Sequence, residues 1–251
     1  MNKRIIPLLL LFLLIASIPN VVAAQVTANI LTRVFPIRVG DVTGSSFTLE
    51  VDGRQYLVTA RHIVTDVTDG GTIFLLREGR WTPYVVNRLH VEPFEADVAV
   101  LALPSVLPQT LPIRATYRGI TLAEDLYFLG FPYGLSLPGI LQQSGFPIPF
   151  VKRGICSAFG KVNNVDYVFL DGHNNAGFSG GPIVRCHPGA NRPTIVGVVS
   201  GFRHQDEPII KEGKPTDFMY RANTGIIVGV AISHVLEAIS KRPIGPVAAT
   251  K

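Results

Sequence analysis

The sequence Gly177-Phe178-Ser179-Gly180-Gly181-Pro182 places one serine among three glycines, directly before the apolar pair Ile183-Val184. Glycine lets the backbone turn tightly without Cβ clashes. Acyl transfer needs an exposed nucleophile and N–H groups aimed at the developing oxyanion. The stretch therefore predicts Ser179 as a nucleophile and the amides of Gly177 and Ser179 as an oxyanion hole. Taken alone, it also fits an ordinary glycine-rich turn.

A serine nucleophile needs a histidine as general base and a carboxylate that holds the histidine in the right tautomer. His62 ends the strand-like run that begins at Tyr56, and Asp97 stands directly before the apolar run Val98 to Leu101. An unpaired carboxylate buried there would be costly, and a histidine partner would explain it. We therefore predict a catalytic triad of His62, Asp97 and Ser179. In isolation, His62 also fits a structural histidine and Asp97 an exposed residue at the end of a strand.

Three segments resemble, in sequence and in order, the motifs of the trypsin-like, chymotrypsin-fold peptidases: Thr59 to His62, Ala96 to Leu101 and Gly177 to Pro182. The similarity is closer to bacterial Deg-type and glutamyl-endopeptidase-type enzymes, and it is carried by Gly130-Phe131-Pro132, Gly154 to Gly160 and Asp171. The match runs from about Gly44 to Lys241. Three ordered motifs are far more specific than any one of them.

The resemblance implies an all-β fold of two packed antiparallel six-stranded β-barrels with a short C-terminal helix. His62 and Asp97 would lie on the first barrel and Ser179 on the second. The active site would then occupy the seam between the barrels.

The segment Val199-Ser200-Gly201-Phe202 resembles the strand with which the family pairs its substrate. An extended peptide would add to it as a further β-strand, with Ser200 near the triad aspartate and Gly201 close to the specificity pocket. His173 stands near the position where trypsin has a pocket aspartate, which argues against Arg or Lys at P1 and leaves acidic, small or apolar residues open. A loop histidine without a pocket role fits equally well. The expected substrate-binding residues are Ser200, Gly201, Phe202 and His173.

Two departures from the family pattern affect function. Phe178 stands where zymogen-activated trypsin relatives carry an aspartate that pairs with a newly cut N-terminus, so we expect activity without such a cut. Only about ten residues follow the C-terminal helix, too few for the PDZ module of Deg enzymes. We therefore expect a monomer.

The rest of the sequence agrees with an all-β chain. Apolar residues make up 47% of the 251 positions, charged residues only 16%, and 24 glycines and 19 prolines are spread along the chain, as suits short strands joined by turns. Asp52-Gly53 between two alternating runs predicts a hairpin. Val235, Leu236 and Ile239 predict a C-terminal helix with Ser233 as its N-cap and Pro243 as its stop. The prolines and glycines between Gly130 and Pro149 predict a long loop.

The N-terminus resembles a signal peptide. Lys3 and Arg4 precede an apolar run from Ile5 to Ile18, followed by Val22-Ala23-Ala24. A helix of that run would measure about 21 Å, short of a bilayer core of about 30 Å, although Val21 to Ala24 would lengthen it into an uncleaved anchor. We expect cleavage after Ala24, export to the periplasm or the medium, and no membrane contact afterwards. The expected divisions are 1–24 signal peptide, 25–241 peptidase domain and 242–251 flexible tail.

Charge and composition exclude several other classes. The formal charge of +5 falls by two once Lys3 and Arg4 are removed, and no dense Lys/Arg block is present, so a nucleic-acid partner is not expected. Cys156 and Cys186 match neither a zinc pair nor a redox motif, and a disulfide between them stays open. We expect no metal and no cofactor.

The predicted activity is therefore hydrolysis of peptide bonds in proteins or peptides. Two alternatives stay open. One is a catalytically silent binding module on the same fold, and the other is an esterase that uses the same triad.

Overall fold

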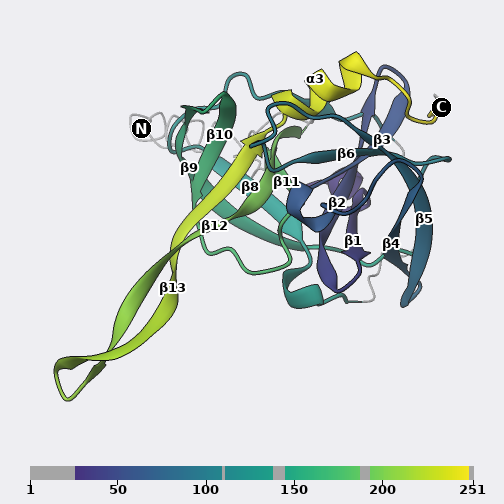
Figure 1. Ribbon diagram of the computed structural model, residues 1–251. Coiled ribbons are helices and arrows are strands. Elements are labelled where there is room, and N and C mark those ends of the chain that lie inside the picture. Colours follow the sequence, from purple (N-terminus) through teal and green to yellow (C-terminus); the bar gives the residue numbers. More distant parts are fainter. Residues whose placement is uncertain (1–25, 109–110, 138–144, 187–192, 249–251) are drawn as a thin grey trace, which may run out of the picture.

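The computed structural model describes residues 26–108, 111–137, 145–186 and 193–248. Its strands form two units that are joined near the middle of the chain (Figure 1). The first is a closed antiparallel barrel with the strand order β1-β2-β3-β6-β5-β4. Its members are β1 (Val34–Val39), β2 (Val42–Val51), β3 (Arg54–Thr59), β4 (Gly71–Arg77), β5 (Arg80–Leu89) and β6 (Ala99–Ala102).

The second unit has the order β11-β8-β9-β10-β13-β12, and pairing between β11 and β12 closes these six strands into a ring. Its members are β8 (Asp125–Gly130), β9 (Phe150–Val162), β10 (Val165–Asp171), β11 (Pro182–Arg185), β12 (Thr194–Lys211) and β13 (Lys214–Ala231). The short strand β7 (Arg114–Ala115) adds to β12 in parallel. The expected pair of six-stranded antiparallel barrels is confirmed.

Buried apolar side chains explain why the two units pack together. One cluster lies inside the first barrel and another inside the second, whereas a third contains residues from both, including Phe47 and Val58 of the first and Leu129 and Val198 of the second. Burial of these side chains stabilises the seam between the barrels at about 25 cal/mol per Å² of apolar surface.

The structure confirms the predicted hairpin turn and C-terminal helix but not the predicted N-cap of that helix. The Asp52-Gly53 hairpin between β2 and β3 is confirmed, and both residues have the positive φ that a two-residue hairpin turn requires. Helix α3 (Ser233–Lys241) lies against β6 and β13 and so bridges both barrels. The N-cap prediction is wrong, because Ile232 occupies that position and the buried Ser233 hydroxyl has no hydrogen-bond partner among the described residues.

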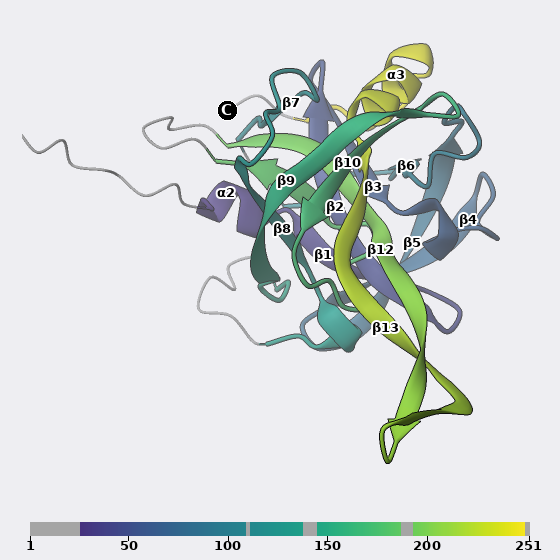
Figure 2. The same cartoon turned by 90° about the vertical axis from the view of Figure 1, so that its left-hand side faces the viewer.

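Three features differ from the expectations. A short helix, α2 (Ala28–Leu31), precedes β1. Strands β12 and β13 run on for 18 residues each and project as a long hairpin away from both barrels (Figures 1 and 2). The segment 242–248, expected to be part of a flexible tail, is bonded to the β2–β3 hairpin: Arg54 donates to the Gly245 carbonyl and the Ala248 amide to the Gly53 carbonyl.

Other expectations fall partly or wholly outside the described residues. The predicted signal peptide, residues 1–24, lies outside them, as do residues 138–144 of the predicted 130–149 loop. The described part of that loop contains the 3-10 turn η2 (Pro132–Gly134) and one isolated bridge, between Leu137 and Ile148. None of the helices in the described ranges is long and apolar enough to span a membrane.

Candidate active site

Strand pairing in the first barrel brings His62 and Asp97 together. His62 lies in the 3-10 turn η1 (Arg61–Ile63) directly after β3, and Asp97 lies just before β6, which pairs with β3 through Thr59 and Ala99. The His62 ring Nδ1 lies 2.8 Å from Asp97 Oδ2, and the His62 amide donates to Asp97 Oδ1 at 3.0 Å. The carboxylate therefore fixes both the ring and the backbone of the histidine.

The second barrel supplies two serines that extend this arrangement. Ser200 of β12 donates its hydroxyl to Asp97 Oδ2 at 2.6 Å, as expected for a residue near the triad aspartate. The Ser200 carbonyl in turn accepts the Ser179 hydroxyl at 3.0 Å. Within the described part of the chain no hydrogen bond joins Ser179 Oγ to the His62 ring, and such bonds are often formed only in the substrate complex.

The electrostatics of the pair suit a general base. The hydrogen bond with Asp97 raises the pKa of the half-exposed His62 ring above its ordinary value, against a smaller opposing effect of burial. Burial acts to raise the pKa of Asp97, but hydrogen bonds from His62 and Ser200 outweigh it, so its pKa lies below the ordinary value. Asp97 is thus held as an anion facing an imidazole that gains stability when it takes a proton.

Close backbone approach explains the glycines around Ser179. Gly177 has φ +101°, and a Cβ there would lie 2.3 Å from the Phe131 carbonyl oxygen. Gly180 has φ +85°, and its Cβ would lie 2.1 Å from the Ser45 carbonyl oxygen. Neither position accommodates a side chain.

The two amides predicted as oxyanion donors have no partner in the described part of the chain. The neighbouring amides of Phe178, Gly180 and Gly181 all donate to backbone carbonyls. In contrast, the amides of Gly177 and Ser179 donate to no group of the described residues. Two unpaired N–H groups flanking a serine hydroxyl are what an oxyanion hole requires.

Sequence reasoning missed Ser45, which holds this turn from the first barrel. Its hydroxyl donates to the Gly177 carbonyl at 2.7 Å and accepts the Phe131 amide at 2.9 Å, while its own amide donates to the Ser179 carbonyl at 2.8 Å. The adjacent peptide is held as well, because the Tyr133 amide donates to the Ala176 carbonyl at 2.7 Å.

The expected substrate-pairing strand has an open edge beside Ser179. Gly201 and Phe202 pair with β13 on one side, through Val228 and Ile227. On the other side, β11 pairs with β12 only as far as Val198. Both Gly201 and Phe202 are partly exposed, so an extended peptide could reach this edge.

His173 lies on the exposed loop between β10 and β11, and its carbonyl accepts the Lys152 ammonium. Its ring makes no hydrogen bond to any described residue. The buried polar residue here is the next one, Asn174, which the sequence analysis did not select. Asn174 donates to the Gly201 carbonyl at 3.2 Å and its carbonyl accepts the Asn223 amide group at 2.6 Å, so it ties the loop to both strands of the hairpin.

Neither cysteine belongs to this site. Cys156 and Cys186 are free and buried, and burial raises the pKa of each thiol to about 11. No cluster of three or more His, Cys, Asp or Glu side chains able to hold a metal ion occurs in the described ranges.

Known proteins share both the family pattern and the fold. The family model of the trypsin-like peptidase domain matches residues 44–190. A mutant of Rv3671c from M. tuberculosis H37Rv, solved in an inactive form, is 17% identical with a TM-score of 0.54, over 89% of this chain and 92% of that one. The HtrA-type protease AlgW, solved with a tripeptide, is 21% identical with a TM-score of 0.54, over 86% of this chain and 62% of that one.

Proposed function

The chain belongs to the family of trypsin-like peptidase domains, and on that premise we propose that it is a serine endopeptidase with His62, Asp97 and Ser179 as its triad. The observation that carries the proposal is the chain of contacts from the His62 ring through Asp97 and Ser200 to the Ser179 hydroxyl, which spans both barrels. The unpaired amides beside Ser179 support it further.

In the proposed reaction, Ser179 Oγ attacks the peptide carbonyl and His62 takes the hydroxyl proton. The developing oxyanion would accept hydrogen bonds from the amides of Gly177 and Ser179. His62 then gives its proton to the leaving amine, while Asp97 stabilises the imidazolium. Water, deprotonated by His62, hydrolyses the acyl-enzyme and restores Ser179.

The substrates would be proteins or peptides bound in extended form along the open edge of β12, with Ser200, Gly201 and Phe202 as pairing residues. His173 would contribute from the neighbouring exposed loop. The AlgW structure contains a tripeptide, which agrees with a peptide ligand for this fold. The protein would be exported with removal of residues 1–24 and act as a monomer without metal or cofactor.

A fluorophosphonate probe tests the nucleophile, because only an activated serine reacts rapidly with it. We expect the purified protein to be labelled, Ser179→Ala to lose the label, and Ser240→Ala, which changes an exposed serine of α3, to keep it. A folded protein without labelling would favour a silent binding module. Labelling accompanied by ester turnover but no cleavage of any peptide in a library would favour an esterase.

A further inference from the structure

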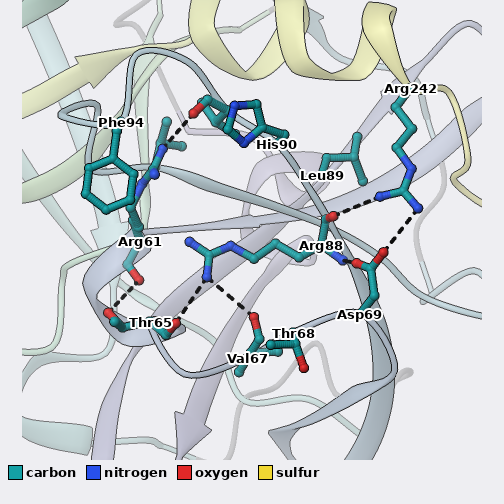
Figure 3. A pocket seen from close by; sticks show the side chains of 12 residues that line it. Arg61, Thr65, Val67, Thr68, Asp69, Arg88, Leu89, His90, Phe94 and Arg242 are labelled. Carbon is teal, nitrogen blue, oxygen red and sulfur yellow. Dashed lines mark hydrogen bonds and ion pairs between the residues drawn. The ribbon is translucent and has the colours of Figure 1, made fainter.

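Beside the turn η1, which also carries His62, lies a cavity of about 470 Å³ whose lining carries an excess of positive charge (Figure 3). We call it the arginine pocket, after Arg61, Arg88 and Arg242. Asp69 is the one carboxylate among its lining residues. That carboxylate is already engaged, since it accepts the Arg88 amide at 2.8 Å and the Arg242 guanidinium at 3.1 Å.

The Arg88 guanidinium is held in the pocket but only partly used. Its Nη1 donates to the carbonyls of Val64, Thr65 and Val67, at 2.9 to 3.4 Å. Its Nε and Nη2 donate to no described residue. Figure 3 shows the side chain reaching across the pocket toward Arg61.

Arg61 is fixed in the same way and also keeps a free donor. Its Nε donates to the Ala96 carbonyl at 3.1 Å and its Nη2 to the Val91 carbonyl at 2.8 Å, while the Phe94 ring lies 4.7 Å from the guanidinium carbon. Its Nη1 has no acceptor in the described part of the chain. Neutral carbonyls and a ring therefore hold this cation in place without cancelling its charge.

The two guanidinium groups repel each other. Burial and the charge of Arg88 lower the pKa of Arg61, and the more weakly felt carboxylates of Asp97 and Glu95 offset this only in part. Burial also lowers the pKa of Arg88. Asp97 is already bonded to His62 and Ser200. Neither guanidinium is bonded to a carboxylate of the described residues. An anion that binds between these two partly buried cations would therefore stabilise both of them.

We propose that the arginine pocket binds a phosphate group, either as inorganic phosphate or as the phosphate of a small organic molecule. The unused N–H groups of Arg61 and Arg88 would donate to its oxygens, in the planar geometry with which arginine binds phosphate. The double negative charge of phosphate matches the excess of three arginines over one aspartate in the lining. The remaining volume, walled by Leu89 and Phe94, suits an apolar body attached to the phosphate.

The site adjoins the proposed catalytic residues. Arg61 directly precedes His62, and its Nε holds the carbonyl of Ala96, the residue before Asp97. A bound phosphate would therefore contact a side chain that connects the backbone of both residues.

Thr68 offers a substitution that leaves every arginine contact in place. It lines the pocket, is exposed, and its hydroxyl makes no hydrogen bond to a described residue. Thr68→Glu would add a carboxylate to the lining of the pocket and oppose the entry of phosphate, whereas Thr68→Gln has nearly the same size without the charge. Thermal unfolding would establish that both variants fold.

Titration calorimetry at physiological salt would measure binding of inorganic phosphate, phenyl phosphate and benzoate, and NMR would follow the arginine Nε–H signals. We expect saturable phosphate binding that shifts the Arg61 and Arg88 signals, becomes at least about tenfold weaker in Thr68→Glu and persists in Thr68→Gln. Tighter binding of phenyl phosphate would identify an organic phosphate as the ligand, and equal or weaker binding the free ion. No saturable binding, unchanged binding in a folded Thr68→Glu, or equal binding of benzoate would overturn the proposal. None of these readouts depends on peptidase activity.

Discussion

Ser45 Oγ donates a 2.7 Å hydrogen bond to the carbonyl of Gly177, across the seam between the two barrels. The donor belongs to β2 of the first barrel, and the acceptor belongs to the turn that carries Ser179. The hydroxyl also accepts the Phe131 amide, so it fixes two loops of the second barrel at once. Through this residue the first barrel sets the position of the proposed oxyanion hole.

Removal of that hydroxyl should impair catalysis as well as stability. In Ser45→Ala the Gly177 carbonyl and the Phe131 amide lose their partner, which costs about 1–3 kcal/mol of folding free energy. A misplaced Gly177 amide should lower kcat by about tenfold to a hundredfold, with little change in KM. Steady-state kinetics on a cleavable peptide would measure this.

The adjacent serine provides the matched control. Ser46 is equally buried, but its hydroxyl donates to the Phe35 carbonyl within the first barrel. Ser46→Ala should therefore lose similar stability and keep kcat. If both variants lose kcat equally, Ser45 does not position the oxyanion hole.

The pH profile of kcat/KM should report the raised pKa of His62. A general base must be neutral, so activity should fall as the pH drops through the His62 pKa, with an inflection above the ordinary value of about 6.5. Asp97→Asn removes the largest cause of the upward shift. That variant should move the inflection down and lower kcat by about 10⁴-fold. If the inflection stays in place, the group that titrates in the pH profile is not the histidine bonded to Asp97.

Activity should not require a cut that creates a new N-terminus. Phe178 is fully buried, and its ring packs edge-on against Phe128 at a centroid distance of 5.1 Å, so no carboxylate is present at that position to pair with an amine. Mass spectrometry of the probe-labelled protein should find the label on chains that begin at Gln25. Labelling confined to chains cut further along would contradict this.

The sequence alone identified candidate residues that stand in short, recognisable motifs. It missed residues whose role depends on how the strands pack in space. His62, Asp97 and Ser179 stand in short motifs that resemble those of the trypsin-like peptidases, and that resemblance implied the two-barrel fold. Ser45 and Ser46 are neighbours in one strand, and only the packing of the barrels decides which of them faces the Ser179 turn.

The long β12–β13 hairpin was missed for a related reason. Its outer part lacks the alternation of apolar and polar residues that marks a half-buried strand, because neither face is buried against a barrel. The backbone pairs that define it, such as Asp206 with Arg221, carry charged side chains in solvent. Asn174 was missed because an asparagine in a loop is ordinary until its burial is known.

Arg33 should contribute more to stability than any exposed ion pair. Its side chain is wholly buried and joins Glu50 of β2, at 2.8 Å, to the Leu111 carbonyl, at 2.7 Å. Arg33→Met leaves Glu50 without its cation and should lower the free energy of unfolding by about 3–5 kcal/mol in urea titrations. Arg221→Met, which removes an exposed pair with Asp206 on the hairpin, should cost no more than about 1 kcal/mol. Equal losses would mean that hydrophobic packing by methionine replaces the buried ion pair without penalty.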